Sequence, residues 1–465
     1  MGYLGHETQR KALGTVIDLG LKRMESNGRE EEIINLINFI ETHLKNLPVK
    51  ADYDKIRSIV EDKDGFMNRY INRVLDEVDP HVLKTWALNF GFEAMYNGTR
   101  KIREMREIHQ CNIPWLILMD PTSACNLHCT GCWAAEYGHK LNLTFEELDS
   151  VVEQGKQLGV YFYMFTGGEP LVRRKDLIRL CEKHKECAFL AFTNGTLVDE
   201  EFCQELKRVG NFALAISLEG FEEVNDLRRG QGVYDKVMHA MDLLKQNGLI
   251  FGTSICYTSK NCETVTSRKF VDLMVEKGCK YAMYFHYMPV GNDATPELLP
   301  TPEQRSYVKD RVRKIRSIKD GEGLFTMDFQ NDGEYVGGCI AGGRNYFHIN
   351  ANGDAEPCVF IHYSGANIRT HSLLEILKQP LFMAYRDNQP FNKNHLRPCP
   401  MLENPEILKR LVKETGAQST DLQSPESAEH LCDKCIPYAQ NWKPCAERLW
   451  NEEKNHFEPV YKNYK

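Results

Sequence analysis

The chain has 465 residues, which is more than one ordinary domain needs, so we expect two or three domains. Hydrophobic residues make up 42% of it, which is enough to bury a core and excludes a disordered chain. The formal net charge of −7 gives no electrostatic reason to expect nucleic acid as a partner. No apolar run reaches the roughly 18 residues of a membrane span, and residues 1–14 hold no signal-peptide run, so we expect a cytoplasmic protein.

The first domain, residues 1–110, is predicted to be helical. Residues 31–47 and 64–78 each place apolar side chains on one face at helical spacing, for example Ile33, Ile37 and Ile40. Both segments carry mixed rather than basic charge, which argues against a membrane-surface helix. We interpret this region as a helical cap that packs on the rest of the chain.

From residue 113 onward, short apolar runs alternate with amphipathic helices. Thr144 and Glu147 form a capping-box pattern at the start of one helix, and Gly248 marks the end of another. Alternating strands and helices predict an α/β sheet of parallel strands, either open or curled into part of a barrel. Such folds place functional groups at the carboxyl ends of their strands. The predicted strands are residues 115–122, 161–168, 189–195, 212–220, 250–258 and 280–289.

Sixteen cysteines occur in this chain, and in a reducing compartment they indicate metal binding or catalysis rather than disulfides. Three lie between residues 125 and 132, and six lie between residues 339 and 445. We interpret the other seven as small buried apolar side chains. These seven are Cys111, Cys181, Cys187, Cys203, Cys256, Cys262 and Cys279.

The first group, Cys125, Cys129 and Cys132, has the spacing C-x3-C-x2-C and follows the first predicted strand. Three thiolates can hold three irons of a [4Fe–4S] cluster and leave the fourth iron open to a small molecule with an amine and a carboxylate. A zinc site with a distant fourth ligand is the alternative. The spacing therefore favours a metal without choosing between iron–sulfur and zinc.

Polar or glycine-rich motifs stand at the ends of three further strands: TGGEP at 166–170, TNG at 193–195 and SLEG at 217–220. Any one of them alone would be a plain turn. Because they occur in order at successive strand ends, we expect them to form one functional rim.

These segments together resemble the radical S-adenosylmethionine (SAM) superfamily over roughly residues 113–290. CNLHCTGC matches its cluster motif, TGGEP its Gly-Gly-Glu-Pro motif, and SLEG its ribose-contacting segment, while residues 225–237 are similar to its Asp-x-x-Arg-Gly stretch. The resemblance implies a partial (βα)6 barrel of TIM type. It also implies a SAM-binding [4Fe–4S] cluster on the three cysteines.

The resemblance assigns roles to the rim. Gly167 and Gly168 let backbone carbonyls approach the methionyl amine, and Glu169 pairs with that amine or with a neighbouring backbone group. Ser217 and Glu219 hydrogen-bond the ribose. The full implied cofactor-binding set is Gly167, Gly168, Glu169, Asn194, Ser217, Glu219 and Arg229. One departure is Gly131, which stands where family members carry an aromatic residue near the adenine; Trp133 follows the cluster motif instead.

The second cysteine group resembles the SPASM extension of radical SAM enzymes, which binds auxiliary iron–sulfur clusters. It opens with C-x13-G-x4-C from Cys339 to Cys358, and Asn352–Gly353 predicts a hairpin turn between them. Six cysteines rather than the seven of the full pattern favour one auxiliary cluster, two remain open, and zinc is the alternative. The predicted metal ligands of this region are Cys339, Cys358, Cys399, Cys432, Cys435 and Cys445.

Three domains follow: a helical region at 1–110, a radical SAM core at 111–300 and a SPASM-like domain at 330–465. The resemblance implies an enzyme that reductively cleaves SAM to a 5′-deoxyadenosyl radical, which abstracts hydrogen from a substrate. The net reaction is expected to be an oxidation or the formation of a C–C or C–S bond. A one-electron donor of the flavodoxin or ferredoxin type is the expected partner.

No motif specifies the substrate, although His286, Tyr287, Asp226 and Arg229 are candidates to face it. One hypothesis is maturation of a ribosomally made peptide, but the N-terminal helices do not resemble the winged-helix leader binder expected there. A lipid-chain or small-molecule coupling enzyme is the second hypothesis. A zinc-stabilised protein without enzyme activity is the third.

Overall fold

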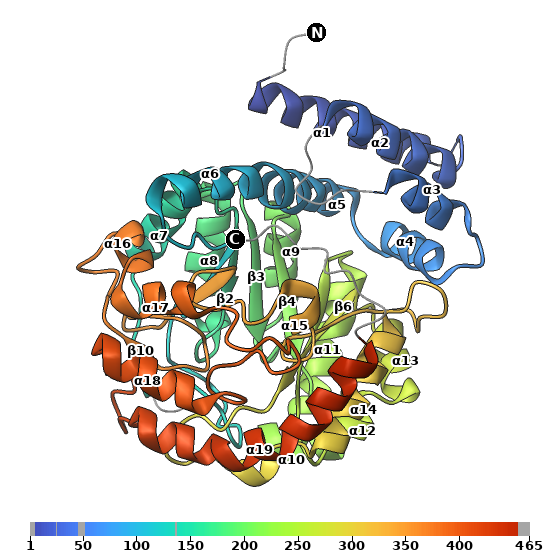
Figure 1. Cartoon of the computed structure of the whole chain (residues 1–465). Helices are drawn as coiled ribbons and strands as arrows, with labels where there is room; N and C mark the ends of the chain where they lie inside the picture. Colours follow the sequence, from blue (N-terminus) through green and yellow to red (C-terminus); the bar gives the residue numbers. More distant parts are fainter. Residues whose placement is uncertain (1–4, 25, 45–51, 135–136, 454–465) are drawn as a thin grey trace.

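The computed structural model describes residues 5–24, 26–44, 52–134 and 137–453. Its centre is a nine-stranded sheet in the order β7-β6-β5-β4-β3-β2-β1-β8-β9 (Figure 1). All neighbouring strands are parallel except β8 and β9. The strands are β1 (Leu116–Met119), β2 (Phe162–Phe165), β3 (Ala188–Thr193), β4 (Phe212–Ser217), β5 (Phe251–Tyr257), β6 (Tyr281–His286), β7 (Phe325–Asp328), β8 (Tyr346–Ile349) and β9 (Ala355–Glu356).

The six predicted strands are confirmed as β1 to β6, and the α/β fold with them. The sheet also extends at both edges: β7 pairs with β6, and β8 pairs with β1. The predicted hairpin is present as β8–β9, with Gly353 at a positive φ of 85° in its turn. Because β7 follows α14 (Pro302–Ile315), the parallel sheet continues past residue 300. The domain bounds stay a prediction.

Helices cover the outer face of the sheet (Figure 1). The first of them, α7 (Phe145–Leu158), has the predicted capping box, in which the Glu147 backbone N–H donates to Thr144 Oγ1 at 3.1 Å. Gly248, at a φ of 68°, follows α11 (Val233–Gln246) as expected. The other elements on this side are η3 (Pro170–Arg173), α8 (Arg174–Lys183), α9 (Glu200–Val209), α10 (Glu222–Arg229), α12 (Cys262–Val265), α13 (Arg268–Glu276) and η4 (Pro296–Leu298).

The N-terminal helices pack at the amino ends of the strands. Tyr70 donates its hydroxyl to the carbonyl of Lys280 just before β6, and Trp115 Nε1, before β1, donates to the carbonyl of Ala94. This region is helical as predicted, although residues 45–47 of one predicted helix lie outside the described residues. Its helices are α1 (His6–Arg23), α2 (Arg29–His43), α3 (Tyr53–Glu61), α4 (Phe66–Glu77), α5 (Pro80–Trp86), η1 (Ala87–Gly98) and α6 (Thr99–His109).

The C-terminal region packs on the inner face of the sheet. Its long last helix, α19 (Ala428–Glu453), lies against α14 and α18 (Figure 1). One apolar cluster joins Leu118, Met164 and Leu190 of the sheet to Phe360, Leu402 and Trp442. The remaining elements are α15 (Gly333–Val336), β10 (Tyr363–Ser364), α16 (Leu373–Leu377), α17 (Pro380–Asn388), α18 (Pro405–Thr415) and β11 (Gln418–Ser419).

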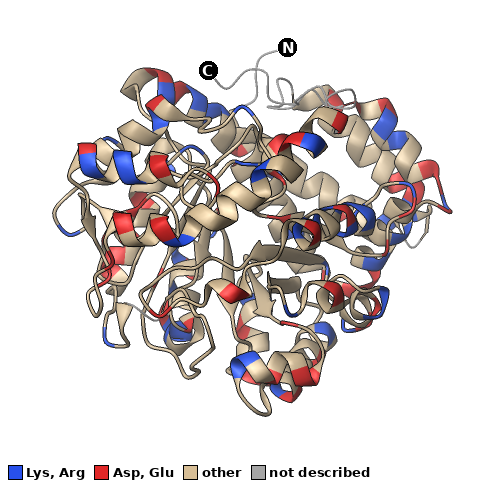
Figure 2. Cartoon of the chain, turned by 60° about the horizontal axis from the view of Figure 1, so that its bottom comes forward, with Lys and Arg blue, Asp and Glu red and all other residues tan. Residues whose placement is uncertain are grey.

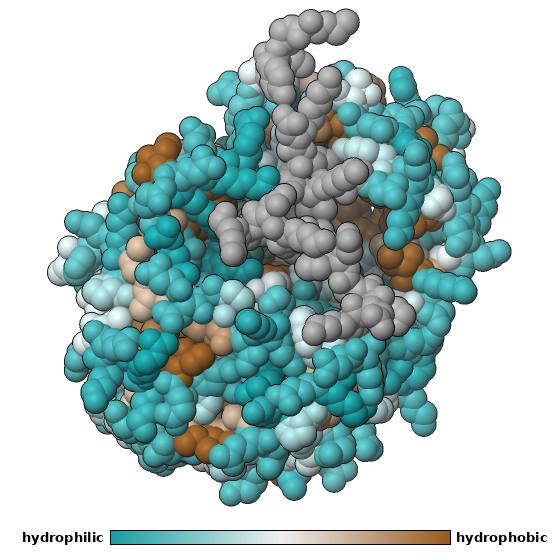
Figure 3. All heavy atoms as spheres, viewed as in Figure 1, coloured by the Kyte–Doolittle hydropathy of each residue, from teal (hydrophilic) through white to brown (hydrophobic). Residues whose placement is uncertain are grey.

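The outer surface carries both signs of charge interspersed along the helices (Figure 2). On the face shown in Figure 3, the described residues are mostly hydrophilic, and the hydrophobic ones form small separate groups. Among the described residues, no helix combines the length and apolar character that crossing a membrane requires.

Candidate functional site

The three clustered cysteines lie on the loop of residues 123–133 after β1, which we call the cluster loop. Their side chains are free thiols and half-buried. Burial, together with the neighbouring thiols of Cys129 and Cys132, raises the pKa of Cys125 to about 11. The Leu127 backbone N–H lies 3.4 Å from Cys125 Sγ, and Arg229 Nη1 lies 3.9 Å from Cys129 Sγ. Three thiols close together, with donors aimed at two of them, fit a cluster that needs thiolate ligands.

The two glycines of the TGGEP motif lie directly against the cluster loop. The Gly168 N–H donates to the carbonyl of Thr122 at 3.0 Å, and the Glu169 N–H donates to the carbonyl of Ala124 at 2.8 Å. A Cβ on Gly167, whose φ is 106°, would lie 2.5 Å from the Thr122 carbonyl oxygen. The glycines therefore allow the loop backbone to approach. Their contact with the methionyl amine stays a prediction.

Glu169 joins the end of β2 to the end of β3. Its carboxylate accepts hydrogen bonds from the Leu171 N–H at 2.9 Å, from Thr193 Oγ1 at 2.7 Å and from the Asn194 N–H at 2.7 Å. Burial raises its pKa, and these three donors oppose the rise. Glu169 was expected to pair either with the methionyl amine of SAM or with a neighbouring backbone group. These hydrogen bonds correspond to the second role.

Asn194 contacts the cluster loop through its side chain. Its amide donates to Asn126 Oδ1 at 2.8 Å, and Asn126 in turn donates to Thr196 Oγ1 at 2.8 Å. Asn194 thus connects the end of β3 to the loop between Cys125 and Cys129. A direct contact with SAM stays a prediction.

The Glu219 carboxylate is bound by other side chains and a backbone N–H of the protein. Only 1% of its side chain is exposed, it forms ion pairs with Arg228 and Arg229, and it accepts the Cys256 N–H at 3.1 Å. Arg228 also exchanges backbone and side-chain hydrogen bonds with Thr130 of the cluster loop. Glu219 therefore holds α10 beside the loop, and half-buried Ser217 lies on the same rim.

An aromatic ring does lie against Gly131. A Cβ at Gly131, which has a φ of 67°, would lie 2.9 Å from Cε2 of Tyr287, a buried residue just after β6. The Trp133 ring instead packs at 5.8 Å from that of His348 and 6.0 Å from that of His362. Trp133 therefore connects the cluster loop to the C-terminal region.

Two of the residues expected to face substrate have structural contacts. His286 is 1% exposed, with Nδ1 at 2.6 Å from the Tyr287 carbonyl oxygen and Nε2 at 2.7 Å from the Tyr438 hydroxyl. Burial lowers its pKa well below the usual value, so the ring is neutral. The Asp226 carboxylate accepts the N–H groups of Gly232 and Tyr234 at the start of α11. Neither side chain presents a free polar group to a substrate.

A buried charged group that the sequence pattern did not indicate joins the core to the hairpin. His348 of β8 lies between two carboxylates, with Nε2 at 2.8 Å from Asp120 Oδ1 and Nδ1 at 2.7 Å from Glu356 Oε2. Burial opposes protonation, but the two carboxylates outweigh it and raise the pKa of His348 to about 10. His348 is therefore an imidazolium at neutral pH.

Three cysteines of the second group, Cys339, Cys358 and Cys399, pack in one apolar cluster. The Gly342 N–H donates to the carbonyl of Pro357 at 2.9 Å, which joins the segments of the first two. Burial, the Glu403 carboxylate and the thiols of Cys339 and Cys358 raise the pKa of Cys399. The N–H groups of Met401 and Leu402 lie 3.4 Å from Cys399 Sγ.

The other three cysteines of this group lie on α19. Cys432 and Cys435 are buried one helical turn apart. Cys445 is ten residues beyond Cys435, which is about 15 Å along a helix at 1.5 Å per residue. It is half-buried beside Arg448, 3.8 Å from Nη2.

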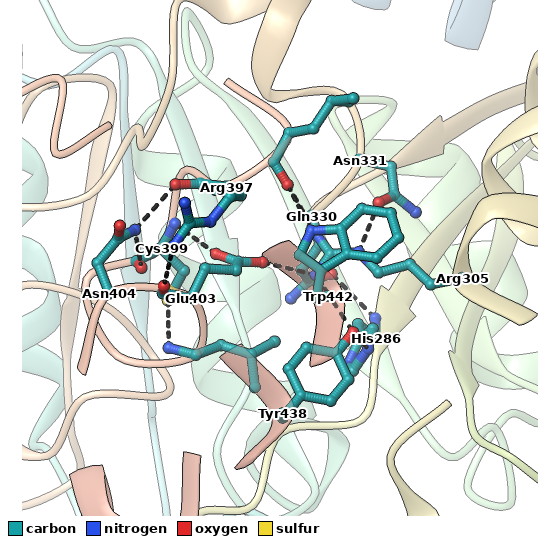
Figure 4. Close-up of polar contacts among 12 residues, drawn as sticks. His286, Arg305, Gln330, Asn331, Arg397, Cys399, Glu403, Asn404, Tyr438 and Trp442 are labelled. Atoms are coloured by element: carbon teal, nitrogen blue, oxygen red, sulfur yellow. Dashed lines mark hydrogen bonds and ion pairs between the residues drawn. The ribbon is translucent and has the colours of Figure 1, made fainter. Parts of the chain in front are cut away.

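A buried ion pair supports the Cys399 segment (Figure 4). Glu403 Oε2 accepts the Cys399 N–H at 2.7 Å, and Glu403 Oε1 lies 2.7 Å from Arg305 Nη1 of α14. The Arg305 guanidinium lies 4.3 Å from the centre of the Trp442 ring and donates to the Tyr438 hydroxyl at 3.2 Å. This pair therefore connects α14, the Cys399 segment and α19.

The family models match the three cysteines of the cluster loop and the first three cysteines of the second group, Cys339, Cys358 and Cys399. The family model of the radical SAM superfamily matches residues 119–261, and the SPASM model, described as an iron-sulfur cluster-binding domain, matches residues 339–401. The Fe-coproporphyrin III synthase of Methanosarcina barkeri is 26% identical over 61% of this chain and 79% of its own length. The mycofactocin maturase MftC of Mycolicibacterium smegmatis is 26% identical over 53% of this chain and 64% of its own length.

Among solved structures, SuiB of Streptococcus suis bound to S-adenosylmethionine superposes with a TM-score of 0.54. The match covers 72% of this chain and 81% of SuiB at 19% identity, which supports the fold. The two family matches imply SAM with a [4Fe–4S] cluster in the core and auxiliary iron–sulfur binding in the C-terminal region, and they set aside the zinc-stabilised, non-enzymatic alternative. The chain thus carries a radical SAM domain at residues 119–261 and a SPASM iron–sulfur cluster-binding domain at residues 339–401.

Proposed function

We propose that Cys125, Cys129 and Cys132 hold the SAM-binding [4Fe–4S] cluster. The observation that carries this proposal is the contact between the cluster loop and the Gly167–Gly168 pair, because it places three thiols and the TGGEP motif at one rim. When bound and reduced, the cluster and SAM supply a 5′-deoxyadenosyl radical that abstracts hydrogen from a substrate C–H bond.

The chain's own residues position this site from three sides. The Glu169 N–H holds the cluster loop to the end of β2, Asn194 holds it to β3, and Arg228 holds it to α10. The Arg229 guanidinium near Cys129 favours the thiolate that a metal needs. We propose Gly167, Gly168 and Ser217 as direct SAM contacts. Glu169, Asn194, Glu219 and Arg229 then act as positioning residues behind them.

For the auxiliary site we propose Cys339, Cys358, Cys399 and Cys432 as ligands of one iron–sulfur cluster. The first three lie close together, and Cys432 belongs to the same apolar cluster of residues. Cys435 is adjacent on α19 and is the second candidate for the fourth ligand. Cys445 packs against the same apolar cluster but lies about 15 Å from Cys435 along α19, so we leave it out of the set. With two iron–sulfur regions in one chain, we propose a net oxidation or a C–C or C–S bond formation.

We propose a small organic molecule with an apolar body as the substrate. Apolar side chains of the sheet's inner face, such as Met164 and Leu190, pack against the C-terminal region, so the support for this class comes from the N-terminal helices and from one relative. The N-terminal helices lie at the amino ends of the strands, opposite the cluster loop, so they are poorly placed to deliver a leader peptide to it. The relative named Fe-coproporphyrin III synthase makes a tetrapyrrole the first compound to test.

A peptide is the second candidate. Its support is the mycofactocin maturase, a relative of the same identity, and the PqqA peptide cyclase of Granulibacter bethesdensis, which is 26% identical over 59% of this chain. The two classes separate in one assay. In this assay each candidate is added to the protein with SAM and reductant. The true substrate should raise 5′-deoxyadenosine formation above the level without substrate. Its mass should also change in proportion to the 5′-deoxyadenosine formed.

The experiment that tests the core proposal is anaerobic incubation of the reconstituted protein with SAM and dithionite. We expect 5′-deoxyadenosine from the wild type and none from Cys129→Ala, which should also lose about four irons per chain. Cys262→Ala, a buried cysteine of α12, is the matched control and should keep both. Full iron content in Cys129→Ala would refute the assignment. A flavodoxin or ferredoxin replacing dithionite would support the proposed electron donor.

A further inference from the structure

Two tyrosine hydroxyls are buried among the auxiliary cysteines. Tyr346, on β8, is 3% exposed, and its hydroxyl oxygen lies 2.7 Å from Cys358 Sγ. A thiolate that binds iron has no proton to give. With a cluster in place, Tyr346 is therefore the donor of this bond and the cysteine sulfur is the acceptor.

The second hydroxyl belongs to Tyr385 of α17. This side chain is fully buried, and its hydroxyl has no hydrogen-bond partner in the part of the chain that the structure describes. The ring is fixed from two sides, by the backbone of Gly342 and by the Phe391 ring at 5.1 Å. Buried hydroxyls without a partner are rare in native proteins, so this one calls for an acceptor.

The Tyr385 side chain packs in the same buried cluster as Cys358 and Cys432, and it lies against Gly342, three residues after Cys339. Burial raises the pKa of Tyr385 well above the usual value, and the next contributions come from four nearby thiols. These belong to Cys339, Cys358, Cys399 and Cys432. They are the four proposed ligands, and as thiolates on a cluster they become the negative acceptors that the hydroxyl lacks.

We propose that Tyr346 and Tyr385 donate hydrogen bonds to the sulfurs of the auxiliary iron–sulfur cluster and raise its reduction potential. The inference rests on the proposed ligand set. A donor at a cluster sulfur stabilises the reduced, more negative state more than the oxidised state. The two tyrosines come from different elements, β8 and α17, so each can be tested without the other.

The test uses the full chain with Cys125, Cys129 and Cys132 replaced by Ala, so that the auxiliary cluster alone titrates. Tyr346→Phe and Tyr385→Phe should each lower its midpoint potential, measured by anaerobic redox titration with EPR detection. A tenfold change in the reduction equilibrium, the size we expect per hydroxyl, is 59 mV for a one-electron couple. Iron and sulfide content should stay at the level of the parent.

The matched control is Tyr284→Phe. Tyr284 is also fully buried, but its hydroxyl donates to the carbonyl of Val265 at 2.8 Å, away from the cysteines. Its removal should leave the potential unchanged. Unchanged potentials in both Tyr346→Phe and Tyr385→Phe, at full iron content, would overturn the proposal.

Two further results keep the inference separate from the ligand assignment. If Cys399→Ala retains the auxiliary iron, the proposed ligand set is wrong and the inference that rests on it falls too, whereas loss of iron from Cys399→Ala with unchanged potentials in the tyrosine variants contradicts the role of the tyrosines alone. If Tyr385→Phe loses iron, a variant with 3-fluorotyrosine at position 385 is used instead. This residue keeps the ring and has a more acidic hydroxyl, which is a stronger hydrogen-bond donor. That variant should raise the potential, and an unchanged or lower value would contradict the proposal.

Discussion

Gly168 and Ala124 are packed so closely that a methyl group on the α-carbon of Gly168 would overlap the carbonyl oxygen of Ala124, the residue before Cys125. The same carbonyl accepts the N–H of Glu169 at 2.8 Å. The conformation of the cluster loop thus depends on the absence of a side chain at the end of β2. A flexible side chain could move aside, but a backbone carbonyl in this position cannot.

Gly168→Ala should therefore displace the cluster loop. We expect loss of about four irons per chain and of 5′-deoxyadenosine formation, while the auxiliary cluster keeps its EPR signal. Gly20→Ala is the control, because a Cβ at Gly20 of α1 would meet no atom within 4 Å. Normal iron content and turnover in Gly168→Ala would show that the loop tolerates the shift.

Cys445 and Cys399 should behave differently when each is replaced by Ser. Cys445 is about 15 Å along α19 from Cys435 at the helical rise, whereas Cys399 lies beside Cys339 and Cys358. We expect Cys445→Ser to retain the auxiliary iron and Cys399→Ser to lose it, measured by iron and sulfide analysis after anaerobic purification. Loss of iron from Cys445→Ser would place it among the ligands and support a second auxiliary cluster.

Glu403→Gln should destabilise the fold. The side chains of Arg305 and Glu403 are fully buried, and removing one charge leaves the other unpaired, at a cost of about 3–5 kcal/mol. Urea denaturation followed by tryptophan fluorescence measures the change. Asp272→Asn provides the comparison, because the Arg268–Asp272 pair is exposed and should contribute about 0–1 kcal/mol. Equal losses in the two variants would contradict this account.

The stability contributed by His348 should depend on pH. Its pKa is raised to about 10 in the folded chain against 6.5 for an ordinary histidine, so the contribution is complete below pH 6.5 and is lost as the pH rises towards 10. Between pH 6.5 and 8.5 the folded state holds a proton that the unfolded state releases. The free energy of unfolding should therefore fall by about 2 kcal/mol more in the wild type than in His348→Gln.

The measurement is urea denaturation of both proteins at several pH values within this window. Above pH 8.5 the unfolded thiols also ionise, so the comparison ends there. Parallel pH profiles for the wild type and His348→Gln would mean that the imidazole is neutral in the folded chain.

Much of the core could be predicted from the sequence because local patterns determine it. The apolar runs of β1 to β6, the capping box of Thr144 and Glu147 and the turn at Gly353 all depend on neighbours in the chain. The cysteine spacing of the cluster loop is local in the same way. β7 was missed because its buried positions are the polar residues Thr326 and Asp328, while Phe325 is exposed, so the segment lacks the apolar run that marks the other strands.

The partners of buried charges could not be predicted. Glu403 pairs with Arg305 from 98 positions earlier, and His348 lies beside Asp120 from 228 positions earlier. No periodicity links such residues, so the sequence does not reveal which charges meet. For the same reason the two arginines of α10 that pair with Glu219 were not predicted, and the contact of Glu219 with the ribose stays a prediction.

The hydrogen bond between His286 and Tyr438 also shows which contacts must form late during synthesis of the chain. The strand that ends at His286 leaves the ribosome long before α19 is made. The hydrogen bond of His286 Nε2 can therefore form only after Tyr438, about 150 residues later, has been added. Cys432 and Cys435 emerge on that same late helix. An iron site that uses Cys432 or Cys435 can therefore be completed only after α19 has been made, about 300 residues later than the thiols of the cluster loop.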